Sequence, residues 1–353
     1  MKEQEKDNQT VNNSDILFIY DAKMCNPNGD PDEENKPRMD YETGRNLVSD
    51  VRLKRYIRDY LLGQKNDDGT PKHDIWVSKV ENDTVSAKKR YAGLVTQFNI
   101  EMKDKAGKEK TKYEDMKPIE PTDQFKQWLL GRLADVRMFG ATIPIAEGDR
   151  GRGGGSLTYT GPAQFSWGVS LHPVEIVPSS GITSTFAGRE RSTESEERQE
   201  YGAMGKDWRV FYSLIAFQGI VSGHRAAKTA LKPTDITLLD QALLKAIPHE
   251  ATTRSKLGQT PRLYLRVEYN DQETTLGDLR RFVEFPPHQE KTPIRDVTDC
   301  KLNVSKLIEA LKKNAERIGV LHYWRDPELS VEPDIANDEA LKSKLPRPGP
   351  KQG

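Results

Sequence analysis

The sequence predicts a single α+β domain whose core elements follow the order βαββαβ, the order of ferredoxin-like folds and RNA-recognition motifs. Two observations carry this prediction: runs of apolar residues typical of buried strands, and segments with apolar residues at helical spacing between them. The strands are expected at 16–20, 163–177, 209–221 and 262–269, and the helices at 46–62 and 234–247. This order places one helix after the first strand and one before the last.

The first strand is the apolar run ILFIY at 16–20, which ends in the dense turn signal NPNGDP at 26–31. The helix at 46–62 then carries a stripe of apolar residues at helical spacing, which predicts that one face is buried. The stripe consists of Leu53, Tyr56, Ile57, Tyr60 and Leu61. The run RVFYSLIAFQGIV at 209–221 is the strongest strand signal, and RLYLRVEY at 262–269 alternates cleanly between apolar and polar residues.

Two polar insertions interrupt this core. Residues 64–122 are rich in lysine and weakly periodic, with short strand-like runs at 75–77 and 91–100, so we expect an insertion without a hydrophobic core of its own. A capped helix follows from residue 121. The second insertion, 178–207, has few apolar residues, and a long excursion between strong strands is usually functional or disordered.

The ends of the chain are expected to lie outside the folded domain. Residues 1–14 are polar, and from 326 to 353 the chain is rich in proline and charge, so we predict a disordered N-terminal tail and a flexible C-terminal tail. A last helix is expected at 303–318. The domain would then span 15–325.

Composition excludes several classes of protein. The chain has 353 residues, with 54 Lys+Arg and 54 Asp+Glu, and this zero net charge argues against a wholly basic binder but not against a local basic face. Only two cysteines and six scattered histidines occur, which predicts neither a disulfide framework nor a zinc site, and no cofactor is expected. No run approaches the ~18 apolar residues of a membrane span, and the polar start has no signal-peptide core. We therefore expect a cytoplasmic protein with no membrane partner.

Cations gather on the predicted first helix. Five of them occur within 14 residues, with Asp50 as the acidic residue among them, and such a face can neutralise successive phosphates. These are Arg45, Arg52, Lys54, Arg55 and Arg58. A solvated helix face is the alternative, and the spacing alone does not decide between the two.

The other motifs carry weaker signals. The glycine-rich run at 151–155, with Arg137 nearby, could cradle a phosphate, but it lacks the P-loop pattern and reads more readily as a flexible loop. The strand at 209–221 lacks the aromatic signature of sheets that stack RNA bases, so binding would follow the RNA backbone. The acidic loop at 29–35 could hold a divalent cation, although a solvated turn fits it better.

Several stretches occur together in an order that resembles one family. They are FIYD at 18–21, NPNGDP at 26–31, VSDVRLKR at 48–55, DVRMFGA at 135–141, TGPAQFSW at 160–167, MGK at 204–206 and TRSK at 253–256. In this order the chain resembles the Cas-seven backbone subunits of type I CRISPR Cascade, closest to the type I-B (Csh-two) branch. The resemblance covers nearly all of 15–318.

The resemblance implies an RNA-recognition-motif palm with a helical fingers insertion at about 64–140 and a β-hairpin thumb at about 178–207. It also implies a non-catalytic, CRISPR RNA-binding subunit that forms a helical filament with copies of itself and other Cascade subunits. The filament would present the guide for pairing with target DNA in antiviral defence. The RNA-binding positions carried over are Asn28, Arg45, Ser49, Arg52, Lys54, Arg55, Arg58, Arg137, Gln164, Met204 and Lys206.

Two alternatives remain open from the sequence. Backbone subunits of type III complexes resemble this fold and cut target RNA with a loop aspartate, so a metal-dependent endoribonuclease using Asp30 or Asp32 is the main rival. A protein that mediates interactions without any guide RNA is the other.

Overall fold

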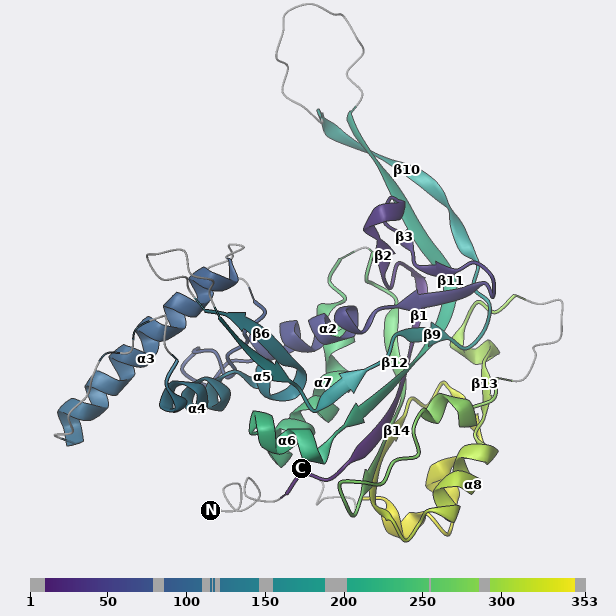
Figure 1. Ribbon diagram of the computed structural model, residues 1–353. Helices are drawn as coiled ribbons and strands as arrows, with labels where there is room; N and C mark the ends of the chain where they lie inside the picture. The colour runs from purple at the N-terminus through teal and green to yellow at the C-terminus, as the bar shows by residue number, and fades with distance from the viewer. Residues whose placement is uncertain are drawn as a thin grey trace, which may run out of the picture.

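The structure is a computed structural model (Figure 1). It describes residues 10–78, 86–109, 115, 117, 121–145, 155–187, 202–253, 255–285 and 293–346, apart from the side chains of 108–109, 179–187 and 202–205. The chain combines helices with a mainly antiparallel sheet, as the sequence predicts. Within the described residues, no helix combines the length and the apolar character needed to cross a membrane.

The centre of the sheet contains the strands that the sequence predicts. Strand β1 (Ser14–Cys25) lies between β11 (Gly202–Val221) and β12 (Gln259–Tyr269), and all pair antiparallel. Strands β8 (Ala163–Phe165) and β9 (Gly168–Ser170) pair with the far side of β11. The described sheet runs in the order β14-β12-β1-β11-β9-β5-β4. The predicted strand at 163–177 is therefore broken into shorter pieces.

Two helices cover one face of this sheet. Helix α2 (Asp50–Gly63) follows β1, helix α7 (Pro233–Glu250) precedes β12, and the two pack against each other. The predicted stripe is correct for Leu53, Tyr56, Ile57 and Leu61, which are buried with Leu239 and Leu243 of α7. A short helix, α6 (Gly223–Thr229), joins β11 to α7.

The C-terminal segment covers the opposite face, which corrects the prediction of a flexible tail from residue 326. Its covering elements are η2 (Leu279–Phe282), η3 (Val297–Asp299), β13 (Lys301–Asn303), α8 (Ser305–Lys313), β15 (Ser330–Glu332), η4 (Ile335–Asn337) and η5 (Lys342–Lys344). Between α8 and β15 the segment also supplies β14 (Ile318–Arg325), which pairs with β12 as a terminal strand of the sheet. Leu329, Ile335 and Leu341 are fully buried in this second core, so 326–346 belong to the fold. The predicted helix at 303–318 ends at Lys313, and β14 was not predicted.

The first insertion forms a unit with a hydrophobic core of its own, contrary to expectation. It contains α3 (Ala87–Glu109), α4 (Asp123–Arg132), α5 (Ala134–Phe139), β6 (Gly140–Pro144) and β7 (Ser156–Thr160). The strand expected at 91–100 is helical, because Tyr91, Val95, Phe98 and Met102 lie on the buried face of α3. Figure 1 shows this unit on the side of α2 that faces away from the C-terminal layer.

The second insertion continues the sheet as a long hairpin. Strand β10 (Ile176–Ala187) pairs with the first half of β11, and in Figure 1 the two project beyond the sheet. Residues 188–201 lie outside the described part.

Four short strands and a 3₁₀ turn fill the segment between β1 and α2. They are β2 (Gly29–Asp30), η1 (Pro31–Glu33), β3 (Lys36–Pro37), β4 (Met39–Asp40) and β5 (Arg45–Val48).

Candidate nucleic-acid interface

The loop after β1 holds the N-terminus of α2. Ser49 is the N-cap, and its hydroxyl accepts a hydrogen bond from the backbone N–H of Arg52 (3.3 Å). The side-chain oxygen of Asn28 accepts hydrogen bonds from the Ser49 N–H (2.9 Å) and hydroxyl (3.0 Å). The two predicted site residues Asn28 and Ser49 thus meet, and they fix the direction of the basic helix relative to the sheet.

Three of the predicted cations on α2 are neutralised by carboxylates, and two of these pairs lie on the helix surface. Lys54 pairs with Asp50 (3.0 Å) and also donates to the side-chain oxygen of Gln164 (2.8 Å). Arg55 pairs with Asp59 (2.7 Å) one turn along the helix. Such pairs on a helix surface reduce the net charge that the face offers to phosphates, so the charge run in the sequence overstates the basic character of this face.

Arg58, the third of these cations, serves a structural contact. Its Nε lies 2.9 Å from Asp135, and both side chains are buried. Asp135 also accepts the backbone N–H groups of Trp76 (2.7 Å) and Val77 (3.2 Å). A buried carboxylate with this set of donors needs its arginine, because an unpaired buried charge is costly. The prediction that Arg58 contacts phosphate is therefore not supported by its surroundings.

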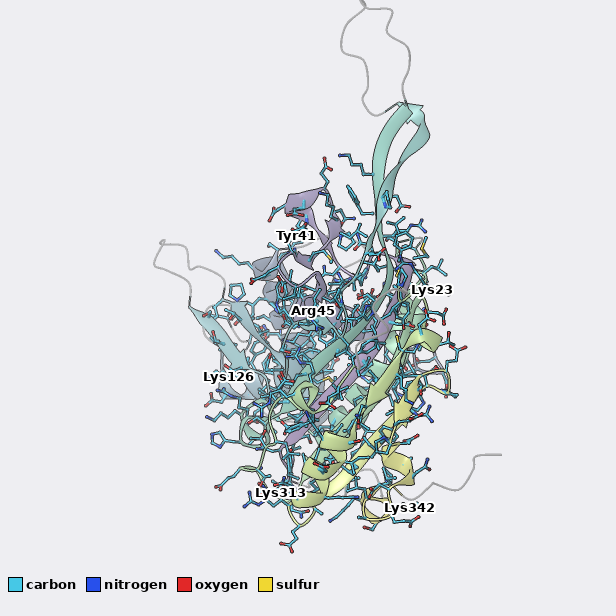
Figure 2. The ribbon with its side chains drawn as sticks, turned by 90° about the vertical axis from the view of Figure 1, so that its right-hand side faces the viewer. Lys23, Tyr41, Arg45, Lys126, Lys313 and Lys342 are labelled. Atoms are coloured by element: carbon cyan, nitrogen blue, oxygen red, sulfur yellow. The ribbon has the colours of Figure 1, made fainter. Side chains whose placement is uncertain are left out.

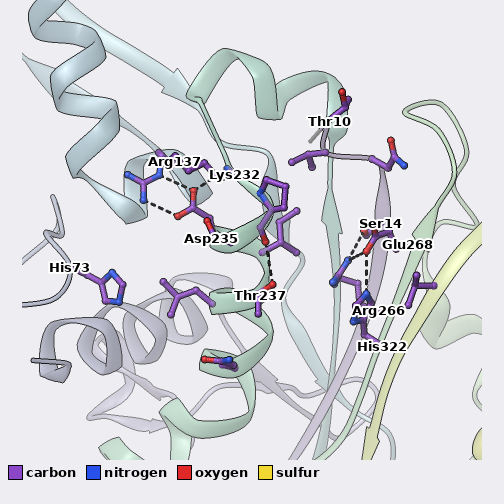
Figure 3. A pocket seen from close by; sticks show the side chains of 18 of the residues that line it. Thr10, Ser14, His73, Arg137, Lys232, Asp235, Thr237, Arg266, Glu268 and His322 are labelled. Carbon is purple, nitrogen blue, oxygen red and sulfur yellow. Dashed lines mark hydrogen bonds and ion pairs between the residues drawn. The ribbon is translucent and has the colours of Figure 1, made fainter. Parts of the chain in front are cut away.

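Arg137 is also buried and paired. It makes a bidentate contact with Asp235 at the start of α7 (2.8 Å for each bond) and lines a pocket of about 850 Å³ (Figure 3). On another wall of the pocket Arg266 contacts Glu268, which also contacts His322 (3.1 Å). Gln64, at the C-terminal end of α2, lies on the lining, so the pocket is at the opposite end of the helix from Ser49.

Two cations near the N-terminus of α2 have no carboxylate partner among the described residues. The guanidinium of Arg52 lies 4.1 Å from the centre of the Tyr56 ring, and its Nε is buried without a hydrogen-bond acceptor. Lys256 donates only to main-chain carbonyls, those of Asn26 (2.9 Å) and Pro27 (3.4 Å). Burial and the charge of Arg52 lower the pKa of Lys256 to about 8. Two adjacent, uncompensated cations form a site suited to an anion.

Sequence reasoning did not single out Lys256, although it stands in the TRSK run. The reason is that only the fold brings it to α2. Strands β1 and β12 pair antiparallel, with Ala22 opposite Gln259, so the turn before β12 lies beside the loop after β1. A local sequence pattern cannot reveal the contact between Lys256 and Asn26, because the two residues are 230 positions apart.

The remaining predicted residues lie outside the pair formed by Arg52 and Lys256. Arg45 donates to the carbonyl of Ser170, and Gln164 donates to the carbonyls of Phe139 (3.1 Å) and Gly161 (3.0 Å). Lys206, in the hairpin, pairs with Glu34 (2.6 Å), and both are exposed. Met204 lies opposite Thr183 in the same hairpin, and its side chain is outside the described part. Figure 2 shows Arg45 and Tyr41 near the base of the hairpin and Lys313 and Lys342 at the far end.

One known protein family matches most of the chain. The family described as CRISPR-associated protein Cas7 matches residues 12–305. This chain belongs to the Cas7 family. A CRISPR-associated protein Cas7 of Haloferax volcanii is 34% identical over 344 residues, which cover 95% of this chain and 92% of the relative.

Solved structures with a likeness to this Cas7-family chain include two chains of CRISPR RNA-guided surveillance complexes. One is 13% identical, covers 91% of this chain and 95% of that chain, and has a TM-score of 0.45. The other, from a complex described as pre-nicking, is 14% identical, covers 75% of this chain and 80% of that chain, and has a TM-score of 0.40.

The two aspartates of the rival prediction occupy different settings in this Cas7-family chain. Asp30 caps the turn η1 by accepting the N–H of Asp32 (3.1 Å), and it pairs with Arg38 (2.8 Å). Asp32 is exposed. Within the described residues, no group of three histidine, cysteine or acidic side chains is placed to hold a metal ion.

Proposed function

We propose that this chain is the CRISPR RNA-binding backbone subunit of a type I surveillance complex, and that it holds the guide by its phosphates. The observation that carries the proposal is the pair of uncompensated cations, Arg52 and Lys256, beside the N-terminus of α2. A binding site for RNA phosphate needs cations whose charge the protein has not already neutralised. Membership of the Cas7 family supports the same function.

The two covered faces of the sheet support a backbone-directed mode of binding. Helices α2 and α7 cover one face and the C-terminal segment covers the other, so neither face offers the open platform on which RNA-recognition motifs stack bases. A guide varies in sequence, and its carrier must leave the bases available for pairing. Contacts to phosphate meet this requirement because they are independent of sequence.

The finer architecture is part of this proposal. The sheet with α2 and α7 would be the palm, the unit with α3 to β7 the fingers, and the β10–β11 hairpin the thumb. Copies of the chain would stack with other Cascade subunits along the guide, in a type I-B complex, and present it to target DNA. Membership of the Cas7 family is consistent with this role.

Salt-dependent RNA binding tests the proposed site. The variant Arg52→Gln with Lys256→Gln removes both cations and keeps polar side chains of similar shape, and Lys313→Gln, an exposed lysine on α8, is the matched control. The log–log slope of affinity for single-stranded RNA against salt should decrease by about 0.7 for each phosphate that the variant no longer neutralises. The control should leave the slope unchanged. An unaltered slope in the double variant, with folding intact by circular dichroism, contradicts the proposed site.

The proposal also states that the chain is not an enzyme, which a cleavage assay tests. The assembled complex is incubated with complementary target RNA and Mg²⁺, and the RNA should remain intact. Metal-dependent cleavage that Asp32→Ala abolishes, and that the distant Asp338→Ala preserves, would instead establish the endoribonuclease. Asp30→Ala is a poorer probe, because Asp30 also caps η1 and pairs with Arg38.

A further inference from the structure

Trp167 is an exposed aromatic residue at an unusual place. It lies in the short link between β8 and β9, and 45% of its surface is accessible, whereas Trp76 is 6% accessible in the core of the first insertion. An exposed tryptophan combines a large apolar face with a polar N–H group, which suits it to a contact at a surface. Among the described residues, the ring contact of this side chain is with a neighbouring arginine, Arg38.

The backbone around Trp167 is held firmly. Gly168 lies directly on the ring of Phe217, and a Cβ at this glycine would come within 2.3 Å of that ring. The carbonyl of Trp167 accepts a hydrogen bond from Arg280 (2.9 Å). The packing of Gly168 and the hydrogen bond from Arg280 therefore both hold the main chain from which the indole projects.

The position of Trp167 relates it to the proposed phosphate site. In the antiparallel pair of β5 and β9, Val48 lies opposite Gly168, so Trp167 comes next to Ser49, the N-cap of α2. The guanidinium of Arg38 lies 5.9 Å from the centre of the indole ring. The N–H of Arg38 donates to the carbonyl of Asn28 (3.0 Å), the residue that holds Ser49. Trp167 and the N-terminus of α2 thus lie side by side, where the paired strands β5 and β9 meet the segments that flank them.

We propose that Trp167, flanked by Arg38, is a stacking platform for one nucleobase of the bound RNA. This proposal rests on the proposed function and adds a base contact to its phosphate contact. An exposed indole stacks on any base, because every base has a π-face, so the contact is independent of sequence. Arg38 is paired with Asp30 (2.8 Å), so the available positive charge comes from Arg52 and Lys256 near the N-terminus of α2. These cations favour an occupant that carries phosphates close to an aromatic ring. A nucleotide has this chemistry, whereas an apolar protein surface does not.

Abasic RNA separates stacking from phosphate binding. Affinity is measured for a fluorescein-labelled single-stranded RNA and for an RNA of the same length with abasic sites, which keeps the phosphates. Trp167→Ala should weaken binding of the normal RNA by about 5- to 150-fold, the range for loss of one stacked base. It should leave binding of the abasic RNA unchanged. Trp167→Phe keeps a ring and should restore most of the affinity.

Trp324 provides the matched control. It is 37% accessible and lies on β14, a terminal strand that β12, β1 and β11 separate from β9. Trp324→Ala should bind both RNAs as the unmodified protein does. Normal RNA should quench tryptophan fluorescence in the Trp324→Phe variant but much less in the Trp167→Phe variant. Abasic RNA should quench neither.

The outcomes distinguish this inference from the proposed function. If the unmodified protein does not bind RNA, the result contradicts both the proposed function and the stacking platform. If Arg52→Gln with Lys256→Gln weakens binding but Trp167→Ala does not, the stacking platform is overturned and the proposed function stands. If Trp167→Ala changes self-association and not RNA affinity, the occupant is another copy of the chain, and the inference is also overturned.

Discussion

Arg58 and Asp135 form a buried ion pair that joins the basic helix α2 to the helical insertion. Their contact of 2.9 Å is completed by two backbone N–H groups, those of Trp76 and Val77, which also donate to Asp135. One carboxylate therefore connects α2, α5 and the segment before α3. We infer that this pair sets the orientation of the insertion relative to the candidate RNA site, and that it does not itself bind RNA.

Arg58→Ala should lower the free energy of unfolding by about 3–5 kcal/mol, because it leaves Asp135 buried without its counter-charge. The matched control is Arg55→Ala, which breaks a partly exposed pair on the same helix and should cost less than about 1 kcal/mol. Urea unfolding followed by circular dichroism measures both. Equal, small losses in the two variants would show that Asp135 is satisfied without Arg58.

Residues 326–346 should be required for folding. Deletion of 326–353 removes Leu329, Ile335 and Leu341 from the second core, and each buried leucine or isoleucine contributes about 2–5 kcal/mol. It also removes Asp326 and Glu328, which pair with the buried Arg262. The control deletes only 347–353 and should unfold at the same temperature as the full chain. A stable 1–325 fragment with an unchanged melting temperature would restore the prediction of a flexible tail.

The core strands and helices could be predicted because each contains its own pattern. The alternating run at 262–269 and the helical stripe at 53–61 specify element and face together. The incorrect predictions of secondary structure have physical causes. The run at 91–100 is rich in residues that suit a strand, and only the wider spacing to Met102 shows the helix. Gly319 suggests the end of a helix, although it lies within β14.

The candidate site could be predicted only in part. The sequence located the basic helix and the loop at Asn28, which do meet in the structure. The sequence could not show which cations lack a carboxylate partner, because the partners of Arg58 and Arg137 lie 77 and 98 residues away along the chain. Lys256 was missed for the same reason. Which cations can bind an anion depends on the ion pairs formed in the folded chain, and a local sequence pattern does not show these pairs.

The first insertion should unfold independently when its aromatic core is disrupted. The ring of Phe125 packs against those of Tyr91 (5.8 Å), Phe98 (5.3 Å) and Trp128 (5.8 Å). Phe125→Ala should cost about 3–5 kcal/mol. Because this core is separate from the two that flank the sheet, hydrogen-exchange protection should fall in α3 and α4 and persist in β1 and β11. Ile100→Ala, at a position 56% exposed on α3, is the control and should leave exchange unchanged.

RNA affinity should depend on pH through Lys256. Its pKa of about 8 in the free protein results from burial and from the charge of Arg52. A bound phosphate favours the charged lysine and raises this pKa, so binding takes up a proton once the pH exceeds about 8. Affinity should therefore fall as the pH rises from 7 to 9, by up to about tenfold if binding requires the charged form. Fluorescence anisotropy at constant ionic strength measures this dependence.

Lys256→Arg tests whether this lysine is the group responsible. Arginine keeps its charge throughout this range, so the variant should bind RNA with a flatter pH profile than the unmodified protein. The stability of the free protein should show the opposite trend. Between pH 8 and 10.5 the unfolded chain binds the proton of Lys256 more tightly than the folded chain does, so the contribution of Lys256 to stability increases with pH. Identical binding profiles for the two proteins would place the anion away from Lys256, because a neutralised lysine in contact with phosphate must weaken the complex.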